Sequence, residues 1–202
     1  MMRAAVALGS NLGDRLANLQ TARDRIRSLD GATLPVAQSA VYETSPIDCE
    51  AGAQNFYNAV IEIGFEKEAE AFFGELQQIE RALGRKRDTP SPPASPTGRG
   101  GGKPRSSRES GLEATGEAPA QDRRKRNLSR TIDLDLLYFG SERREGVGLQ
   151  LPHPRMTERK FVMQPLCDIA PDLRLPGQSK NVGELLAQLR GPGKIKRVAE
   201  VW

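Results

Sequence analysis

Hydrophobic and polar residues follow two different periods along the chain. Short apolar runs, several of them with a period of two, predict four β-strands: 3–8, 33–44, 56–65 and 131–139. Segments with a helical period of 3.6 predict two amphipathic helices, 14–29 and 68–83, and shorter helical pieces near 157–169 and 182–190. The order β-α-β-β-α-β predicts an α+β fold, a ferredoxin-like sandwich with helices on one face of an antiparallel sheet.

The two longer predicted helices have clear apolar sides. In the first, the residues at helical spacing are Leu16, Leu19, Ala22, Ile26 and Leu29. In the second, they are Phe72, Leu76, Ile79 and Leu83. The first helix follows the loop "GSNLGD", in which Asp14 or Asn11 is placed to cap its N-terminus. Both helices are therefore expected to pack on the sheet through one side.

The segment 88–126 interrupts this pattern. It contains six Pro, six Gly and five Ser, and its one large aliphatic residue is Leu112. Such a composition buries too little apolar surface to offset the entropy that is lost on ordering. We therefore expect a flexible insertion that interrupts a single domain spanning 1–202.

The composition argues against several classes of protein. No apolar run reaches the roughly 18 residues that a membrane-spanning helix needs, so no membrane partner is expected, and the N-terminus lacks a secretory signal pattern. Two distant cysteines, Cys49 and Cys167, and the single histidine His153 show no spacing typical of a zinc site. The expected location is a reducing cytoplasm, without disulfides.

The net charge of +4 is unevenly distributed. Residues 85–126 hold 11 of the 30 Lys and Arg but only 5 of the 26 Asp and Glu, which leaves 19 basic and 21 acidic residues elsewhere. The stretch "RRKR" at 123–126 leaves open a nucleic-acid-binding ferredoxin-like module. No convincing pair of surface aromatics for base stacking lies on a predicted strand, so we expect no nucleic-acid partner.

Two acids interrupt the apolar strand "TIDLDLLYF" at 131–139. Asp133 and Asp135 are two residues apart, so on a strand both side chains point to the same face, about 7 Å apart. They repel each other unless a cation lies between them, which favours a Mg²⁺ site completed by phosphate oxygens and water. The doublet alone leaves open a solvated sheet face that merely carries two acids, since this spacing is common.

The polar residues around the doublet favour the metal site. They are Arg130 just before it, Glu80, Arg85 and Arg87 in "IERALGRKR", and His153, Arg159 and Phe161 in "LPHPRMTERKFV". Arginine suits phosphate because its guanidinium donates two hydrogen bonds at once. Each residue alone has a structural alternative, such as a helix-end charge, a loop histidine or a core phenylalanine. Acids and arginines together are typical of phosphoryl transfer, which depends on positioning and charge neutralisation.

These motifs together resemble the 6-hydroxymethyl-7,8-dihydropterin pyrophosphokinase family, folate-pathway enzymes that transfer pyrophosphate from ATP to a pterin alcohol. The quoted motifs are "ALGSNLGDR", "YETSP", "FYNAV", "IERALGRKR", "RTIDLDLLYFG" and "LPHPRMTERKFVMQPLCDIAPDL". The resemblance covers the chain apart from 88–126, and the R-x-x-D-[LIV]-D core followed by P-H and R-x-F is highly specific. It implies a Mg²⁺-dependent enzyme whose small-molecule substrates are ATP and the dihydropterin; we expect a monomer.

The resemblance also implies a role for each matching residue. Asp133 and Asp135 would hold two Mg²⁺ ions. Three arginines would contact the triphosphate and the transition state: Arg85, Arg87 and Arg130. Glu80 and His153 would line the nucleotide site, and Arg159 would reach the phosphates from the other side. The residues implied in pterin binding are Thr44, Pro46, Phe56, Asn58 and Phe161. Of these, Asn58 would bond to the polar edge of the pterin and Phe161 would stack on its ring.

The chain departs from the family pattern in two places. Phe56 stands where tyrosine is common, which keeps an aromatic contact and removes a hydroxyl. Family members usually carry W-G-P-R before the acidic strand, whereas this chain has Asn127 and Leu128 in place of the Trp and Gly. The missing tryptophan leaves open a catalytically weak pterin or nucleotide binder on the same fold.

Overall fold

The computed structural model describes most of the chain outside its central segment. The described residues are 1–46, 54–84, 130–146, 148–190 and 194–202, without the side chains of 34–36. Contacts within the chain define two units, Met1–Arg85 with Asn127–Trp202 and, separately, Lys86–Arg126. The predicted insertion 88–126 falls within the second unit and lies outside the described residues. A single interrupted domain therefore stays a prediction.

The secondary structure of the first unit follows the predicted order. In the described residues the strands are β1 (Met2–Ser10), β2 (Ala32–Gln38), β3 (Val41–Thr44), β4 (Phe56–Phe65), β5 (Asp133–Phe139) and β6 (Ile195–Ala199). The helices are α1 (Arg15–Arg27), α2 (Ala69–Ala82), α3 (Lys160–Ile169) and α4 (Val182–Gln188), with a 3-10 turn at Met156–Glu158. Asp14, rather than Asn11, caps α1, because its Oδ1 accepts a hydrogen bond from the Ala17 N–H at 3.0 Å.

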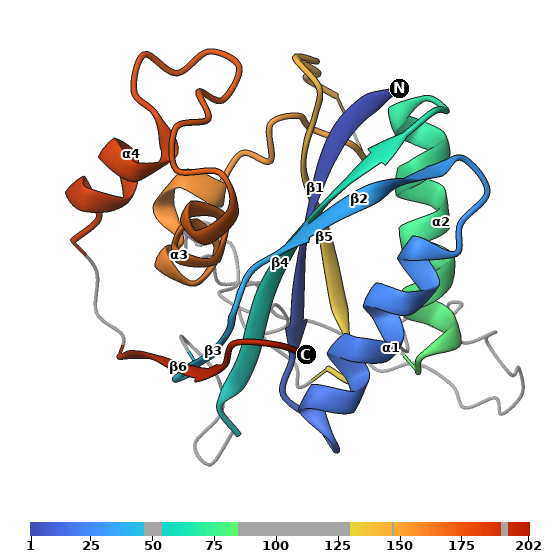
Figure 1. Cartoon of the computed structure of the whole chain (residues 1–202), viewed down its shortest axis with the longest axis vertical. Coiled ribbons are helices and arrows are strands. Elements are labelled where there is room, and N and C mark those ends of the chain that lie inside the picture. Colours follow the sequence, from blue (N-terminus) through green and yellow to red (C-terminus); the bar gives the residue numbers. More distant parts are fainter. Residues whose placement is uncertain (47–53, 85–129, 147, 191–193) are drawn as a thin grey trace, which may run out of the picture. The chain divides into compact units, whose positions relative to one another are not determined.

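The strands form one antiparallel sheet in the order β5-β1-β4-β3-β6, and β2 also pairs with β4 (Figure 1). The central pair, β1 and β4, is in register from Met2 opposite Phe65 to Ser10 opposite Tyr57. Because β1 lies between β4 and β5, the end of β1 is next to the start of β5, where the two acids are.

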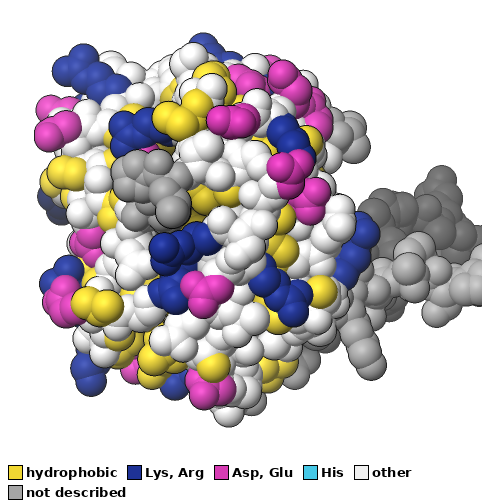
Figure 2. Space-filling view, turned by 45° about the vertical axis from the view of Figure 1, so that its right-hand side comes forward, with side chains coloured by type: hydrophobic (Ala, Val, Ile, Leu, Met, Phe, Trp, Pro, Cys, Tyr) yellow, Lys and Arg dark blue, Asp and Glu magenta, His cyan; other side chains and the backbone are white. Residues whose placement is uncertain are grey.

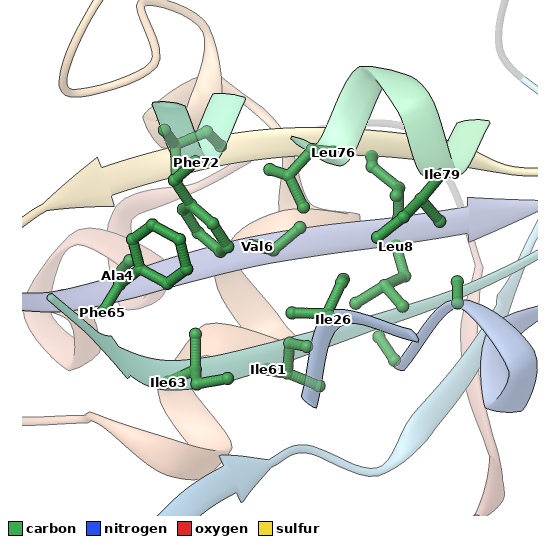
Figure 3. Close-up of a cluster of buried hydrophobic side chains, with 14 of the residues drawn as sticks. Ala4, Val6, Leu8, Ile26, Ile61, Ile63, Phe65, Phe72, Leu76 and Ile79 are labelled. Carbon is green, nitrogen blue, oxygen red and sulfur yellow. The ribbon is translucent and has the colours of Figure 1, made fainter. Parts of the chain in front are cut away.

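Helices cover both faces of the sheet, with α1 and α2 on one side and α3 and α4 on the other (Figure 1). Successive strand residues point to opposite faces, so Val6 joins the core under α1 and α2 (Figure 3) and Ala5 joins the core under α3 and α4. The α+β class with an antiparallel sheet is confirmed. The expected placement of helices on one face is wrong, because α3 and α4 bury the second face.

The predicted strand 33–44 is divided into β2 and β3. Gln38 pairs with Ile61 but Tyr42 pairs with Asn58, so the register against β4 advances by one residue. At the break, the Ser39 hydroxyl accepts a hydrogen bond from the Val60 N–H at 2.9 Å. One extra residue on a strand reverses the face of every residue after it. The break therefore determines which residues of β3 face α3.

The C-terminal strand β6 is not among the predicted strands, because "IKRVA" is short and largely polar. It pairs with β3 and extends the sheet at that edge. After it, Trp202 is buried in the core under α1, and its indole N–H donates to the Ser39 carbonyl at 2.7 Å. The end of the chain thus fixes the same break that divides β2 from β3.

The described surface shows no large segregation of charge on the side of α1 and α2. Figure 2 turns this side forward, and Lys and Arg side chains there are interspersed with Asp and Glu. This mixture agrees with the near-neutral charge that the sequence assigns to the chain outside 85–126. Among the described helices, none combines the length and the apolar character needed to cross a membrane.

Candidate active site

Asp133 and Asp135 lie on the sheet face that α3 covers, as the strand period predicts. The intervening Leu134 points the other way and is buried in the core under α1 and α2. The side chains of the two acids are half-buried, at 24% and 35% exposure. A shared face for the pair is therefore observed, in a partly desolvated setting and not on an open surface.

Gly9 of β1 lies between this acid pair and Asn58 of β4. It pairs with Asp133 on one side and with Asn58 on the other. A Cβ atom added to Gly9 would lie 3.4 Å from the Asn58 Oδ1 and 4.0 Å from the Asp133 Cβ. Because glycine has no side chain, the strip of sheet between an amide and an acid stays open.

Two arginines approach the acid pair from different elements. Arg130, just before β5, donates from Nη1 to the Asp133 Oδ2 at 2.6 Å. Arg159, which precedes α3, donates from Nη1 to the Asp135 Oδ2 at 3.5 Å. Arg130 and Arg159, which are 29 positions apart in the sequence, thus lie with the two acids on one face of the sheet. This arrangement can bind a polyphosphate together with a cation.

The local electrostatics favour a bound cation. Burial, and then the neighbouring Asp133 carboxylate, raise the pKa of Asp135 above its ordinary value, while His153 and the arginines act in the opposite direction. The charged form of Asp135 therefore carries a cost in the folded protein. A divalent cation beside both carboxylates would remove that cost.

Arg130 is held by the last residue of β1 and the residue after it, neither of which is a predicted site residue. The Asn11 Oδ1 accepts a bond from the Arg130 N–H at 2.6 Å, and the Asn11 N–H donates to the Arg130 carbonyl at 3.1 Å. The Ser10 hydroxyl donates to the Thr131 carbonyl at 2.6 Å. Ser10 and Asn11 are fully buried. A polar pair at the end of an otherwise apolar strand is the sequence signal for such a role.

Glu80 supports β5 from the opposite face of the sheet. It lies on α2, is 2% exposed, and its Oε1 accepts a hydrogen bond from the Leu134 N–H at 2.8 Å. This bond satisfies a backbone donor on the outer edge of β5, between the two acids. The structure thus shows a supporting contact for Glu80, and its contact with a nucleotide stays a prediction.

His153 follows β5 and lies near Asp135. Its backbone N–H donates to the Leu137 carbonyl at 2.8 Å, and its Nδ1 accepts a bond from the Arg155 N–H at 3.2 Å. Burial lowers the pKa of His153, although the Asp135 charge partly opposes this effect. A lowered pKa favours the neutral ring, and the Arg155 N–H bond to Nδ1 favours the tautomer that carries its proton on Nε2. The Nε2–H remains as a donor for an anionic ligand.

The start of α3 places an aromatic ring beside Arg159, the arginine that pairs with Asp135. The Arg159 Cζ lies 5.7 Å from the centroid of the Phe161 ring. Phe161 itself is half-buried and packs against the core under α3 and α4. One short segment therefore supplies both a guanidinium and a ring face.

The remaining candidates lie at the ends of β3 and β4. Thr44 pairs with Phe56 across the two strands, and its Oγ1 accepts a bond from the Asn58 Nδ2 at 2.8 Å. Asn58 is 6% exposed, whereas Thr44, Phe56 and Pro46 are half-buried. Phe56, Asn58 and Thr44 share the face of the acid pair. Pro46 lies two residues beyond β3.

The candidates that fall outside the described residues are Arg85 and Arg87, together with Asn127 and Leu128. Within the described part, no group of three or more His, Cys, Asp or Glu could hold a metal. The acid pair itself offers two donors, the carboxylates of Asp133 and Asp135. That set fits Mg²⁺, which commonly takes one or two carboxylates and completes its shell with phosphate oxygens and water.

A comparison with protein families identifies the chain. The family described as 7,8-dihydro-6-hydroxymethylpterin-pyrophosphokinase matches residues 5–94 and 108–171. The chain belongs to this family. The residues that match the pyrophosphokinase family include both acids, the loop after β1 and the start of α3, which all belong to the site described above. The sequence-based prediction of the family, and of an ATP-dependent transferase of folate biosynthesis, is confirmed.

Relatives of known function cover most of the chain. The 2-amino-4-hydroxy-6-hydroxymethyldihydropteridine pyrophosphokinase of Pseudomonas aeruginosa is 32% identical over 187 residues, which are 93% of this chain and 91% of that protein. The enzyme of the same name from Haemophilus influenzae is 32% identical over 196 residues, 97% of this chain and 98% of that protein. The match thus covers most of the length of both pyrophosphokinases.

Solved structures of the pyrophosphokinase family share the fold. The wild-type Plasmodium falciparum HPPK-DHPS with pteroate superimposes with a TM-score of 0.58 at 11% identity, over 93% of this chain and 44% of that chain. An HPPK-DHPS in complex with substrates gives a TM-score of 0.55 at 10% identity, over 92% of this chain and 43% of that one. This chain therefore spans less than half the length of these structural neighbours.

Proposed function

We propose that this chain transfers pyrophosphate from ATP to the hydroxymethyl oxygen of 6-hydroxymethyl-7,8-dihydropterin and releases AMP. The observation that carries the proposal is one sheet face with two adjoining halves. An acid pair with two arginines suits a metal-bound triphosphate, and the strip of Thr44, Asn58 and Phe56 suits a flat polar heterocycle. Gly9 joins the halves without a side chain between them.

The transfer is a substitution at phosphorus. The hydroxymethyl oxygen attacks the β-phosphorus of ATP, and the bond from that phosphorus to the oxygen bridging it to the α-phosphate breaks. The bridging oxygen leaves with AMP, and the hydroxyl proton passes to solvent. Such a reaction needs little covalent chemistry from the protein, so positioning and charge neutralisation account for most of the catalysis.

We assign the Mg²⁺ site to Asp133 and Asp135 and expect two ions. When bound, Mg²⁺ neutralises charge on the β and γ phosphates. As metal ligands, the two acids would hold their arginine partners less strongly. Arg130 and Arg159 would then donate to phosphate oxygens, and the two bonds between Asn11 and the Arg130 backbone fix the position from which the Arg130 side chain extends.

The other side chains orient the two substrates. We propose that the His153 Nε2–H donates to a phosphate oxygen, since its Nδ1 is already an acceptor. Phe161 covers the pterin ring, and Asn58 bonds to its polar edge. Arg85 and Arg87 stay sequence-based predictions for triphosphate binding. We expect a monomer, in which one chain supplies all of these residues.

The decisive experiment measures AMP formation by the purified protein with ATP, Mg²⁺ and the dihydropterin alcohol. AMP should form only when the alcohol and Mg²⁺ are both present, with one pterin diphosphate per AMP. AMP or ADP formation that does not depend on the alcohol would contradict the proposal.

A weak pterin or nucleotide binder is the second candidate function, favoured by Asn127 and Leu128 in place of the family Trp-Gly. Calorimetric titration with each ligand separates the two functions. Binding of both ligands without AMP formation would establish the binder, and restoring Trp-Gly-Pro before Arg130 should then recover turnover.

A further inference from the structure

A buried tyrosine joins β3 to α3 close to the proposed pterin site. The Tyr42 hydroxyl lies 2.9 and 2.8 Å from the two carboxylate oxygens of Asp168. Tyr42 is 6% exposed, and the Asp168 side chain is 16% exposed. A hydrogen bond from a buried hydroxyl to a partly desolvated carboxylate is among the stronger polar contacts in proteins. We call this contact the Tyr42–Asp168 bridge.

The bridge is reinforced from the C-terminal strand. Arg197 of β6 pairs with Tyr42 in the sheet, and its Nη2 lies 3.8 Å from the Asp168 Oδ2. The Arg197 Cζ is also 5.9 Å from the Tyr42 ring centroid. The Gln164 Nε2 lies 3.5 Å from the Asp168 Oδ1. The carboxylate of α3 is thus held by groups from β3, β6 and its own helix.

Both ends of the bridge lead directly to the proposed pterin residues. On the strand side, Tyr42 pairs with Asn58, and Thr44, two residues later on the same face, accepts the Asn58 amide bond. On the helix side, Asp168 is seven residues after Phe161, so both lie on one side of α3, two turns apart. The strand ends that would bind the pterin edge and the helix that would present its ring partner meet at this bridge.

We propose that Tyr42 and Asp168 are positioning residues that fix the separation between Phe161 and the Asn58–Thr44 pair, and so set the affinity for the pterin. The inference rests on the proposed function. A planar ring needs its stacking partner and its edge partners at one defined spacing, and a small displacement of either lowers affinity. The phosphate half depends less on this spacing, since the two acids lie on β5 and Asn11 holds the Arg130 backbone beside it. In that half, Arg159 is the group that adjoins α3.

A purely structural role would weaken folding without distinguishing the ligands, and the chain offers a matched control for it. The Tyr138 hydroxyl donates to the Glu62 Oε2 at 2.6 Å, another buried tyrosine–carboxylate contact on the same sheet face. Both residues pair with Ala5 of β1, four residues from Gly9. At about 3.3 Å per residue, this contact is roughly 13 Å from the site.

The experiment compares Tyr42→Phe with Tyr138→Phe in the full chain. It measures the Kd of the dihydropterin, the Kd of the α,β-methylene analogue of ATP with Mg²⁺, and the thermal unfolding midpoint. We expect Tyr42→Phe to raise the pterin Kd about 5- to 30-fold and to change the nucleotide Kd less than about threefold. Tyr138→Phe should lower the midpoint to a similar extent and leave both Kd values unchanged.

Two substitutions of Asp168 test the proposal independently of whether Tyr42→Phe folds. Asp168→Asn keeps a carbonyl acceptor for the tyrosine, so it should raise the pterin Kd less than Asp168→Ala does. The proposal is overturned if Tyr42→Phe and Asp168→Ala leave the pterin Kd within twofold, or if Tyr138→Phe raises it equally. If the wild-type chain forms no AMP and binds no pterin, the proposed function itself has failed, which is a distinct result.

Discussion

At the scale of single residues, the two acids of the site have different surroundings although they share a strand face. Asp133 is in a 2.6 Å ion pair with Arg130. Asp135 has the longer 3.5 Å contact with Arg159, and burial raises its pKa. A raised pKa means that the folded protein holds the proton more tightly than the unfolded chain does. Stability is therefore lost as the pH rises from about 3.8 through the raised pKa.

This difference predicts opposite effects of two similar substitutions. Without Mg²⁺ at pH 7, Asp135→Asn should keep or raise the free energy of unfolding, whereas Asp133→Asn should lower it by up to about 1 kcal/mol by breaking the ion pair. Both variants should lose turnover by about 100-fold or more, because each removes a metal ligand. Denaturant unfolding and AMP release measure the two effects. Wild-type activity in either variant would remove the basis for the metal assignment.

Phe161 gives a second prediction at this scale. Phe161→Ala should weaken pterin binding by roughly 1–3 kcal/mol, the usual worth of an aromatic stack. The affinity for the ATP analogue should barely change, because arginines and metal hold the phosphates. Titration calorimetry with each ligand, with Phe161→Leu as an intermediate variant, measures this. A loss confined to the nucleotide would place Phe161 away from the pterin.

At the scale of elements, Arg15 connects the first turn of α1 to β3 and β4. Its Nη1 donates to the Asn55 carbonyl at 2.7 Å and lies 3.1 Å from the Glu43 Oε1, and its Cζ is 3.8 Å from the Tyr57 ring centroid. These three contacts hold the ends of both strands from the face opposite the site. The strand ends carry Thr44, so their geometry bears on the proposed pterin pocket.

Arg15→Met should therefore lower the free energy of unfolding by about 1–2 kcal/mol and raise the pterin Kd several-fold. Arg23→Met is the matched control on the same helix, because the Arg23 guanidinium lies 5.1 Å from the Trp202 ring, away from these strand ends. The control should lose some stability and keep its pterin affinity. Equal pterin affinities in the two variants would show that the strand ends do not depend on Arg15.

At the scale of the whole molecule, Gly84 and Thr131 flank the central segment, one on each side. A Cβ atom added to Gly84 would lie 3.7 Å from the Thr131 Oγ1, so these two flanking residues are close together. A short linker can span such a gap. The entropy of closing a loop grows only with the logarithm of its length, so 39 extra residues cost about 1–2 kcal/mol.

Replacing 88–126 with a few residues should therefore leave the body folded, slightly more stable, and able to bind Mg²⁺ and the ATP analogue. Turnover should equal that of the parent or exceed it, particularly with Trp-Gly-Pro restored before Arg130. Unfolding, nucleotide binding and AMP release measure these outcomes. A shortened protein that no longer binds nucleotide would make 88–126 part of the site. Hydrogen exchange in the parent tests the predicted flexibility of this segment.

The two buried tyrosines also predict how the stability of the protein changes at high pH. Burial raises the pKa of both Tyr42 and Tyr138, with contributions from Asp168 and Glu62. The unfolded chain then releases these protons first, so stability should fall as the pH rises above about 10. Tyr138→Phe should flatten this decline while lowering stability at pH 7. Unfolding in denaturant at pH 8 to 11 tests it, and an unchanged slope would contradict it.

Much of the fold and of the site follows from sequence pattern, because the relevant forces are local. A period of two fixes that Asp133 and Asp135 share a face and that Leu134 points to the core. Helical spacing fixes the buried sides of α1 and α2. Motif residues such as Arg159 and Phe161 are recognisable because phosphate and heterocycle binding restrict which side chains can serve.

Tertiary structure alone decided the rest, because it depends on pairings between distant segments. The one-residue shift at Ser39 sets the face of Tyr42 and Thr44, and only pairing with β4 determines it. The burial of the second sheet face under α3 and α4 has the same origin. Asn11 fixes Arg130 across 119 residues of sequence, and no local period encodes such a contact. Sequence thus determined which chemical groups are present, and long-range packing determined their distances.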